Sequence, residues 1–463
     1  MTSFRSRLAL SLRSAAVTTA AALVTLAVAV LLDPEPGPAI FGMLLAVSLS
    51  RSQLERDLRG RLEAGLVLPL VALMGAGVGA LLVSLPWLGA LVFTLAVTLS
   101  VYLRRFGELW RRIGGLIALP FTVLLVAPLQ SERLGPGGSL LVTLAVGVTA
   151  WIAVTVLQLA AARLGALTPA SVRPPAPSEG SPSPRTPPRL DATTRLAVQM
   201  GAAVGIAFVV GYLVFPDRWS WIVLTALLVT VGNAGRADVT HKAVQRVLGA
   251  GVGSVIALVP LLLPHPAPAV GIGLALLALF AGLVARPFGY VGWTLAVTVV
   301  LALAQSVTTG RFSLLERWEE IALGAVIAVA VAWLLLPVRS ESTVRRRLAD
   351  LLSATADWLE IVTAPERAPE DGEADAPRAR VDVALARVTR VAGPYDAARR
   401  WLPPSWRPRA CGWLDTARSA VALLLDRPRI GARRPLGTAR RSLRAPDELQ
   451  AALDALLEAA SGS

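Results

Sequence analysis

The chain has 463 residues, of which 54% are apolar and only 16% are charged, whereas a typical soluble domain carries about 25% charged residues. This composition excludes an ordinary water-soluble enzyme, and a single cysteine, Cys411, excludes a disulfide framework. A formal net charge of +14 is compatible with nucleic-acid binding. Together with the apolar content, however, it favours a membrane protein whose basic residues lie on one side of the bilayer and which has no nucleic-acid partner.

Twelve apolar stretches follow one another along the chain, and a transmembrane helix needs about 20 mainly apolar residues. Because they have no polar helical face, we expect helices that are buried or exposed to lipid. Two of them, 38–50 and 219–234, are short, and we expect these to be tilted, broken or partly re-entrant. The predicted spans are 15–32, 38–50, 64–84, 86–103, 113–129, 139–162, 196–215, 219–234, 247–264, 268–285, 290–308 and 319–337.

Basic residues are distributed unequally between the loops. With a cytoplasmic N-terminus, the inner loops carry 20 Lys and Arg residues and the outer loops only four, which are Arg133, Arg218, Arg311 and Arg317. Basic loops of membrane proteins stay in the cytoplasm. The sequence therefore predicts an all-α, multi-pass protein of a bacterial-type plasma (inner) membrane, with both termini in the cytoplasm.

A Pro/Ser-rich run at 168–190 predicts an extended cytoplasmic linker between two sets of six spans, 1–167 and 191–338. Because six is an even number, both sets enter the membrane in the same orientation, which predicts two parallel six-helix repeats. A short Arg, Phe and Gly motif follows both span four and span ten, with Phe106 and Phe288 at corresponding places.

The C-terminal region 339–463 differs from the rest, since residues 338–463 hold 21 Arg and 17 Asp or Glu. Apolar residues recur at helical spacing in four stretches, which predicts a cytoplasmic α-helical tail. The stretches are 341–363, 377–402, 412–426 and 446–460. The Arg-rich stretch 427–444 is interpreted either as a contact with anionic lipid headgroups or as a solvated basic face.

Ionisable residues are nearly absent from the predicted spans, so the candidate site residues lie at span ends. The inner loop after span eight holds Arg236, Lys242 and Arg246, which could bind a substrate carboxylate by charge-assisted hydrogen bonds. Asp238 and His241 in the same loop are candidates for coupling or gating. The alternative is a basic loop that only directs membrane insertion.

At the outer side, Trp219 and Trp221 begin span eight and could stack on an aromatic substrate. The alternative is that both tryptophans anchor the span at the membrane interface, where Trp is enriched. Arg317 and Glu319 open span twelve and are further candidates for coupling or gating.

Catalytic motifs are lacking: the sequence contains no Walker A pattern, no G-x-S-x-G and no H-E-x-x-H. We therefore expect no enzyme activity, no catalytic residues, no cofactor and no metal site.

The segment 195–337 resembles the fusaric-acid-resistance (FUSC) family of aromatic acid exporters. The matching features are Arg195 at the start of a span, Pro216, the runs 219–225 and 240–249 with Gly253, and the closing run 317–324 through Pro337. The resemblance implies an integral inner-membrane permease that exports aromatic carboxylic acids. Plant malate channels resemble the same six-span unit, which keeps an anion channel open as an alternative.

The leading hypothesis is a secondary exporter of small organic, aromatic carboxylate anions, driven by the membrane potential or the proton motive force. The positive inner face would concentrate cytosolic anions at the entrance. The alternatives are an organic-anion channel of the same fold and a membrane scaffold whose tail binds a cytoplasmic partner. The expected surroundings are the lipid bilayer and the small anion, and a homo-oligomer is compatible with the sequence.

Overall fold

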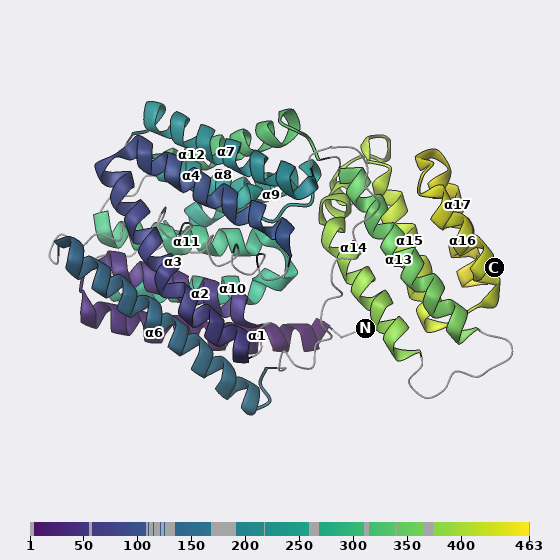
Figure 1. The fold of residues 1–463 in the computed structure, drawn as a ribbon, viewed down its shortest axis with the longest axis horizontal. Helices are drawn as coiled ribbons and strands as arrows, with labels where there is room; N and C mark the ends of the chain where they lie inside the picture. Colours follow the sequence, from purple (N-terminus) through teal and green to yellow (C-terminus); the bar gives the residue numbers. More distant parts are fainter. Residues whose placement is uncertain are drawn as a thin grey trace. The chain divides into compact units, whose positions relative to one another are not determined.

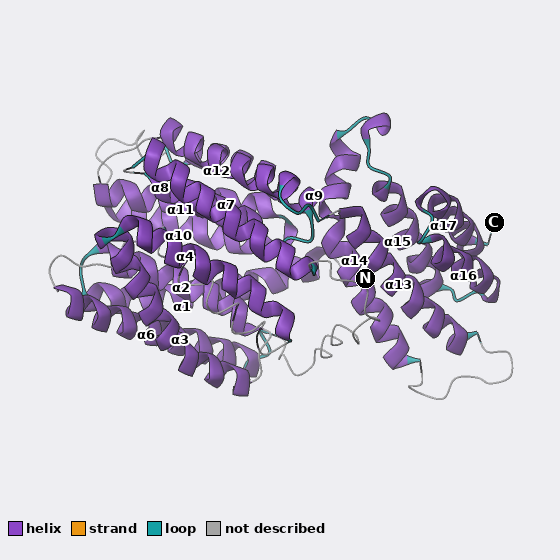
Figure 2. Cartoon of the chain, turned by 45° about the horizontal axis from the view of Figure 1, so that its top comes forward, coloured by secondary structure: helices purple, strands orange, loops and turns teal. Residues whose placement is uncertain are grey.

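The computed structural model describes residues 4–54, 58–107, 110, 114, 121, 125, 135–167, 191–216, 218–258, 268–309, 314–338, 340–363 and 374–462. Every regular element in these residues is a helix (Figure 2). The predicted linker 168–190 and nearly all of the predicted span 113–129 lie outside the described residues.

Eleven of the predicted spans overlap with helices, which fits an all-α membrane protein. They are α1 (Phe4–Leu32), α2 (Pro36–Leu54), α3 (Leu58–Ser84), α4 (Pro86–Tyr102), α6 (Gly135–Arg163), α7 (Ala192–Val214), α8 (Trp219–Thr230), α9 (Arg236–Ile256), α10 (Pro268–Ala285), α11 (Tyr290–Thr309) and α12 (Leu314–Leu334) (Figure 1). By length and composition, the described parts of five helices, α1, α4, α6, α7 and α10, can cross a membrane, and shorter apolar helices include Gly37–Ser50 and Trp219–Thr230. The complete set of twelve spans stays a prediction.

The chain divides into two compact units. The membrane unit comprises Met1–Arg173, Pro187–Gly232 and Lys242–Leu336, and the tail unit is built mainly from Asn233–His241 and Pro337–Ser463. The boundary between the units falls inside α9, whose first six residues belong to the tail unit.

Two apolar clusters form the core of the membrane unit. One joins α1, α2 and α6 with part of α10, and the other joins α3, α4, α7, α8 and α12. Small residues let the backbones approach: a Cβ on Gly42 would lie 2.6 Å from a methyl group of Val146. Aromatic rings fill the second cluster, where Phe93 meets Phe208 edge to face with ring centroids 5.3 Å apart. Close packing of this kind holds helices together in lipid, where the hydrophobic effect does not act between them.

The two halves of the membrane unit pack on each other through corresponding helices. The first helix of the N-terminal half, α1, packs on α10, and the first helix of the second half, α7, packs on α4. Both α4 and α10 are followed by a short 3₁₀ helix, η1 (Leu103–Phe106) and η4 (Arg286–Phe288). Such reciprocal contacts are expected of two related halves, although the repeat itself stays a prediction.

The tail unit consists of α13 (Ser340–Val362), α14 (Asp375–Trp401), η5 (Pro404–Trp406), α15 (Ala410–Asp426), η6 (Ile430–Ala432), α16 (Arg433–Ser442) and α17 (Pro446–Ser461). The four stretches with helical spacing are confirmed as α13, α14, α15 and α17. Their apolar faces form a separate core that includes Leu348, Trp413 and Leu453. A bidentate ion pair joins α15 to α14, with Arg418 Nη2 2.6 Å and Nη1 3.1 Å from the two carboxylate oxygens of Asp396. This hydrogen bonding raises the pKa of Arg418.

Candidate functional site

The segment that begins at Arg236 is a helix, whereas the sequence predicts an inner loop there. Residues 236–256 form α9, so the basic residues lie along its first half. Asp238 stands in the first turn, where a carboxylate interacts favourably with the positive end of the helix dipole. Its Oδ2 accepts a hydrogen bond of 3.2 Å from the backbone N–H of Ala234. The side chain therefore stabilises the start of α9, and its predicted role in coupling stays a prediction.

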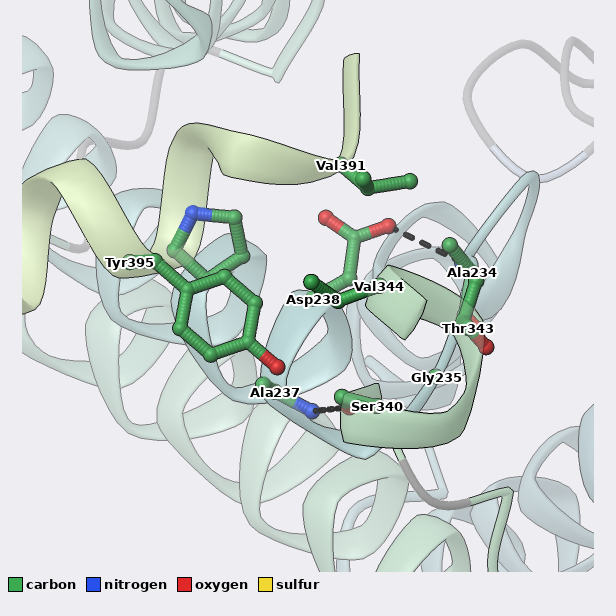
Figure 3. Close-up of a pocket in the computed structure, with 10 residues that line it drawn as sticks. Ala234, Gly235, Ala237, Asp238, Ser340, Thr343, Val344, Val391 and Tyr395 are labelled. Atoms are coloured by element: carbon green, nitrogen blue, oxygen red, sulfur yellow. Dashed lines mark hydrogen bonds between the residues drawn. The ribbon is translucent and has the colours of Figure 1, made fainter. Parts of the chain in front are cut away.

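The start of α9 lies against α13 and α14 within the tail unit (Figure 3). The backbone N–H of Ala237 donates to Ser340 Oγ at 2.9 Å. Around this bond is a cavity of about 10 Å³, lined by Asp238, Thr343 and Tyr395 among others, which is the size of one water molecule. Burial raises the pKa of Tyr395 to about 12. The cavity is too small for an organic substrate.

The three basic residues of α9 are spread along the helix. Arg236 and Arg246 are ten residues apart, which is about 15 Å along a helix. Lys242 Nζ donates at 3.2 Å to the carbonyl oxygen of Val231, directly after the end of α8, where cations stabilise the unpaired carbonyl groups. His241 is half-buried on the same helix. Of this group, Arg246 remains as the residue with the strongest case for anion binding.

Arg246 lies in the middle of α9 and is only 1% exposed. Among the described residues, its Nε and Nη2 atoms have no hydrogen-bond partner. Close packing above it explains the burial, since a Cβ on Gly249 would lie 2.9 Å from Thr294, and one on Gly253 would lie 2.7 Å from the carbonyl oxygen of Leu295 on α11. A buried guanidinium with unsatisfied N–H groups is costly, so an anion that reached it would be bound strongly.

A second buried arginine is close to the first. Arg317 on α12 is 8% exposed, and its charge is near enough to that of Arg246 for the two to repel. The guanidinium carbon of Arg317 lies 4.5 Å from the ring centroid of Trp221 on α8, within the range of a cation–π interaction. The electrostatic field of Arg317 is also shaped by Glu320, one turn further along α12.

Glu320, and not Glu319, is the carboxylate of this group. Glu319 is exposed, whereas Glu320 is 1% exposed and its Oε1 lies 3.3 Å from Arg218 Nε. Arg218 also pairs with Glu316. We call Arg246, Arg317, Glu320 and Trp221, with Arg218 and Glu316 at the edge, the arginine cluster.

The two tryptophans of α8 face different surroundings. Trp221 lies against Arg317, whereas Trp219 packs in an aromatic group with Phe208 and Tyr212, at centroid distances of 5.3 and 5.2 Å. Residues two apart on a helix point to nearly opposite sides. Trp221 is thus part of the arginine cluster, and Trp219 joins α8 to α7.

The arginine cluster brings together helices that the sequence separates by up to about a hundred residues. It holds three cations and two carboxylates, a formal excess of one positive charge, next to one aromatic ring. This combination suits a small aromatic ring that carries one carboxylate. Among the residues that the structure describes, no group of three or more His, Cys, Asp or Glu is placed to hold a metal ion. Sequence reasoning missed Glu320 and Arg218 as members; their only signal was the clustering of charges at the outer ends of spans eight and twelve.

Comparison with known proteins identifies the segment that contains this cluster. Residues 202–331 match the family described as Fusaric acid resistance protein-like, which confirms the resemblance for this part of the chain. The chain is 29% identical over 179 residues to the p-hydroxybenzoic acid efflux pump subunit AaeB of Pectobacterium carotovorum, covering 35% of this chain and 27% of the relative. It is 25% identical over 185 residues to the subunit of the same name from Escherichia coli K12, covering 36% and 28%. The alignment thus spans little more than a quarter of these relatives. No solved structure matches.

Proposed function

We propose that this chain, which carries a Fusaric acid resistance protein-like segment at residues 202–331, exports small aromatic carboxylate anions across a bacterial-type inner membrane. The observation that carries the proposal is Arg246, a fully buried guanidinium whose Nε and Nη2 have no hydrogen-bond partner among the described residues. All members of the arginine cluster lie inside the matched segment. The function named for the relatives, p-hydroxybenzoic acid efflux, supports an aromatic acid as substrate.

Each part of the substrate has a matching group. The carboxylate would accept hydrogen bonds from the unpartnered N–H groups of Arg246, and the ring would lie beside Trp221. Arg317, already held over the Trp221 ring at 4.5 Å, would add a second positive charge. The carboxylate of Glu320 would compete with the substrate carboxylate for the arginines of the cluster. This competition would keep the affinity for the anion low enough for release. Arg246 is enclosed in this conformation, so binding requires the helices around it to open, as alternating access demands.

The direct test is efflux of radiolabelled p-hydroxybenzoate from preloaded cells that express the wild type or Arg246→Met. A charge-assisted hydrogen bond contributes about 1.5–3 kcal/mol, so we expect the variant to export about ten- to hundred-fold more slowly. Arg380→Gln, which removes an exposed arginine from the tail unit, is the matched control and should export at the wild-type rate. Equal export by wild type and Arg246→Met would contradict the proposal.

Stability separates a functional from a structural role for Arg246. Replacing a buried, poorly paired charge by an apolar side chain of similar length is often neutral or stabilising. We therefore expect Arg246→Met to melt at or above the wild-type temperature in detergent while export falls. A large loss of thermal stability in this variant would instead show that Arg246 has a structural role. Large unitary currents under voltage clamp would favour the channel alternative.

A further inference from the structure

The connection between α14 and α15 carries two exposed tryptophans in an arginine-rich setting. Trp401 is 83% and Trp406 is 75% exposed, whereas the other two tryptophans of the tail unit, Trp358 and Trp413, are 4% and 1% exposed. Residues 399–409 read RRWLPPSWRPR, with four arginines and no acidic residue. We call these eleven residues the tryptophan tip.

The tryptophan tip is a defined structure and not a loose loop. The backbone N–H of Trp406 donates to the carbonyl oxygen of Pro403 at 3.0 Å, and Arg407 Nε donates to the carbonyl oxygen of Leu402, also at 3.0 Å. Three prolines further restrict the backbone, which lowers the entropy lost when such a segment binds a surface. The rigid backbone therefore holds the two large rings in water. Exposing them costs free energy unless they bind to a membrane or another apolar surface.

We propose that the tryptophan tip docks onto the headgroup region of an anionic lipid bilayer, with Trp401 and Trp406 in the interface and the arginines on the phosphates. Trp is enriched at this depth of a membrane, because its ring is apolar and its N–H is polar. Arginines beside it add electrostatic attraction to anionic lipid and keep their charged ends in the headgroup layer. The inference does not depend on the exporter function.

Chain connectivity keeps a membrane within reach of the tail unit. Five residues join the end of α12 at Leu334 to the start of α13 at Ser340, and six steps between successive Cα atoms span at most about 20 Å. Tyr395, six residues before Trp401, lines the same small cavity as Ser340. The tryptophan tip therefore belongs to the end of the tail unit at which the chain arrives from the last apolar helix.

Two of the four arginines have carboxylate partners. Arg399 pairs with Asp415, and Arg409 pairs with Asp447. All four side chains are about half exposed or more. Exposed pairs of this kind contribute little stability, so lipid phosphates can compete for the guanidinium groups. The Arg-rich stretch 427–444 has no tryptophan, which makes it the weaker membrane contact of the two and a matched control.

The test places an environment-sensitive dye on the tip of the full-length chain. Cys411→Ser removes the single cysteine, and Ser405→Cys then carries a nitrobenzoxadiazole label. The chain is reconstituted in nanodiscs of phosphatidylcholine alone or of equal parts phosphatidylcholine and phosphatidylglycerol, each with or without a lipid bearing a shallow nitroxide. We expect the nitroxide lipid to quench the label at least about two-fold in the anionic nanodiscs.

Matched variants distinguish docking from mere proximity. Trp401→Ala with Trp406→Ala, and separately Arg400→Gln, should each reduce the quenching by about half or more, whereas Arg440→Gln with Arg441→Gln should leave it unchanged. A label at Ala386→Cys lies on α14, 15 residues before Trp401 and so about 22 Å from it along the helix, and should stay in water. A label at position 405 that no lipid nitroxide quenches, in either nanodisc, overturns the proposal and points to a protein partner for the tip.

Discussion

Arg246 has opposite effects on the stability of the chain and on the proposed transport. Its burial removes a guanidinium from water, and the described surroundings leave two of its nitrogen atoms without a partner. A buried charge without partners lowers stability, and in the proposed function a substrate carboxylate offsets this cost. The neighbouring pair Arg317 and Trp221 adds charge and an aromatic surface at the same place.

Tyr395 gives a residue-scale prediction in the tail unit. Burial raises its pKa to about 12, against about 10 in an unfolded chain. The folded state keeps the phenol proton where the unfolded state loses it, so this contribution to stability is complete below about pH 10 and is lost as the pH rises towards 12. Absorbance at the tyrosinate band, taken as the difference between wild type and Tyr395→Phe, should titrate with a midpoint near pH 12. A midpoint near 10 would mean that the hydroxyl is solvated.

At the same scale, the sequence identified most of the arginine cluster but not how its members combine. Arg246, Arg317 and Trp221 were predicted as candidates from charge type and place. Glu320 was missed in favour of Glu319, because one residue changes the direction of a side chain by about 100° and the packed face of α12 depends on its neighbours. Arg236 was grouped with Arg246 because a loop brings residues together that a helix separates.

At the scale of elements, Gly324 sets how closely α12 approaches α8. A Cβ at this position would lie 2.4 Å from the carbonyl oxygen of Ile222 and 2.9 Å from Thr225, and a backbone atom cannot move aside. We expect Gly324→Val to separate the helices that carry Arg317 and Trp221, with a loss of about 1–3 kcal/mol and of most export. Thermal unfolding in detergent measures the loss of stability, and the efflux assay measures the loss of export.

Gly77→Ala is the control for this prediction. Gly77 lies inside α3, and a Cβ there would meet no atom of the described residues within 4 Å. Alanine stabilises an exposed helix interior by about 0.5–1 kcal/mol relative to glycine, so we expect unchanged export and equal or higher stability. If both glycine variants have the same effect, then Gly324→Val does not act by separating α12 from α8.

Elements with continuous apolar runs were predictable because lipid demands them. The first half of α9 was not, since Arg236, Asp238 and Lys242 give it the polarity of a loop. Its helical form depends on contacts of the tail unit that hydropathy does not reveal, such as the hydrogen bond from Ala237 to Ser340. The tail helices followed from their spacing, because their apolar faces meet in one core.

At the scale of the whole molecule, the separation of charges decides how an exported anion would be driven. Without Arg246, which is buried beside Arg317, the predicted inner loops carry 19 basic residues and the outer loops four, a field that would gather anions on the cytoplasmic side. A membrane potential that is negative inside then favours exit of a monovalent anion by about 2.3 kcal/mol per 100 mV, close to a fifty-fold gradient. Glu320, being buried, offers the alternative of a proton exchanged for the substrate.

Efflux from vesicles with imposed gradients separates these two driving forces. We expect a valinomycin-induced potential, negative inside, to accelerate export of p-hydroxybenzoate by the wild type. In separate vesicles with an imposed pH gradient and equal K⁺ on both sides, nigericin, which then collapses the pH gradient, should have little effect. The same potential should leave vesicles with Arg246→Met nearly inactive, because the anion is no longer bound. If nigericin abolishes export and the potential has no influence, protons drive the cycle, and Glu320→Gln should then remove the dependence on pH.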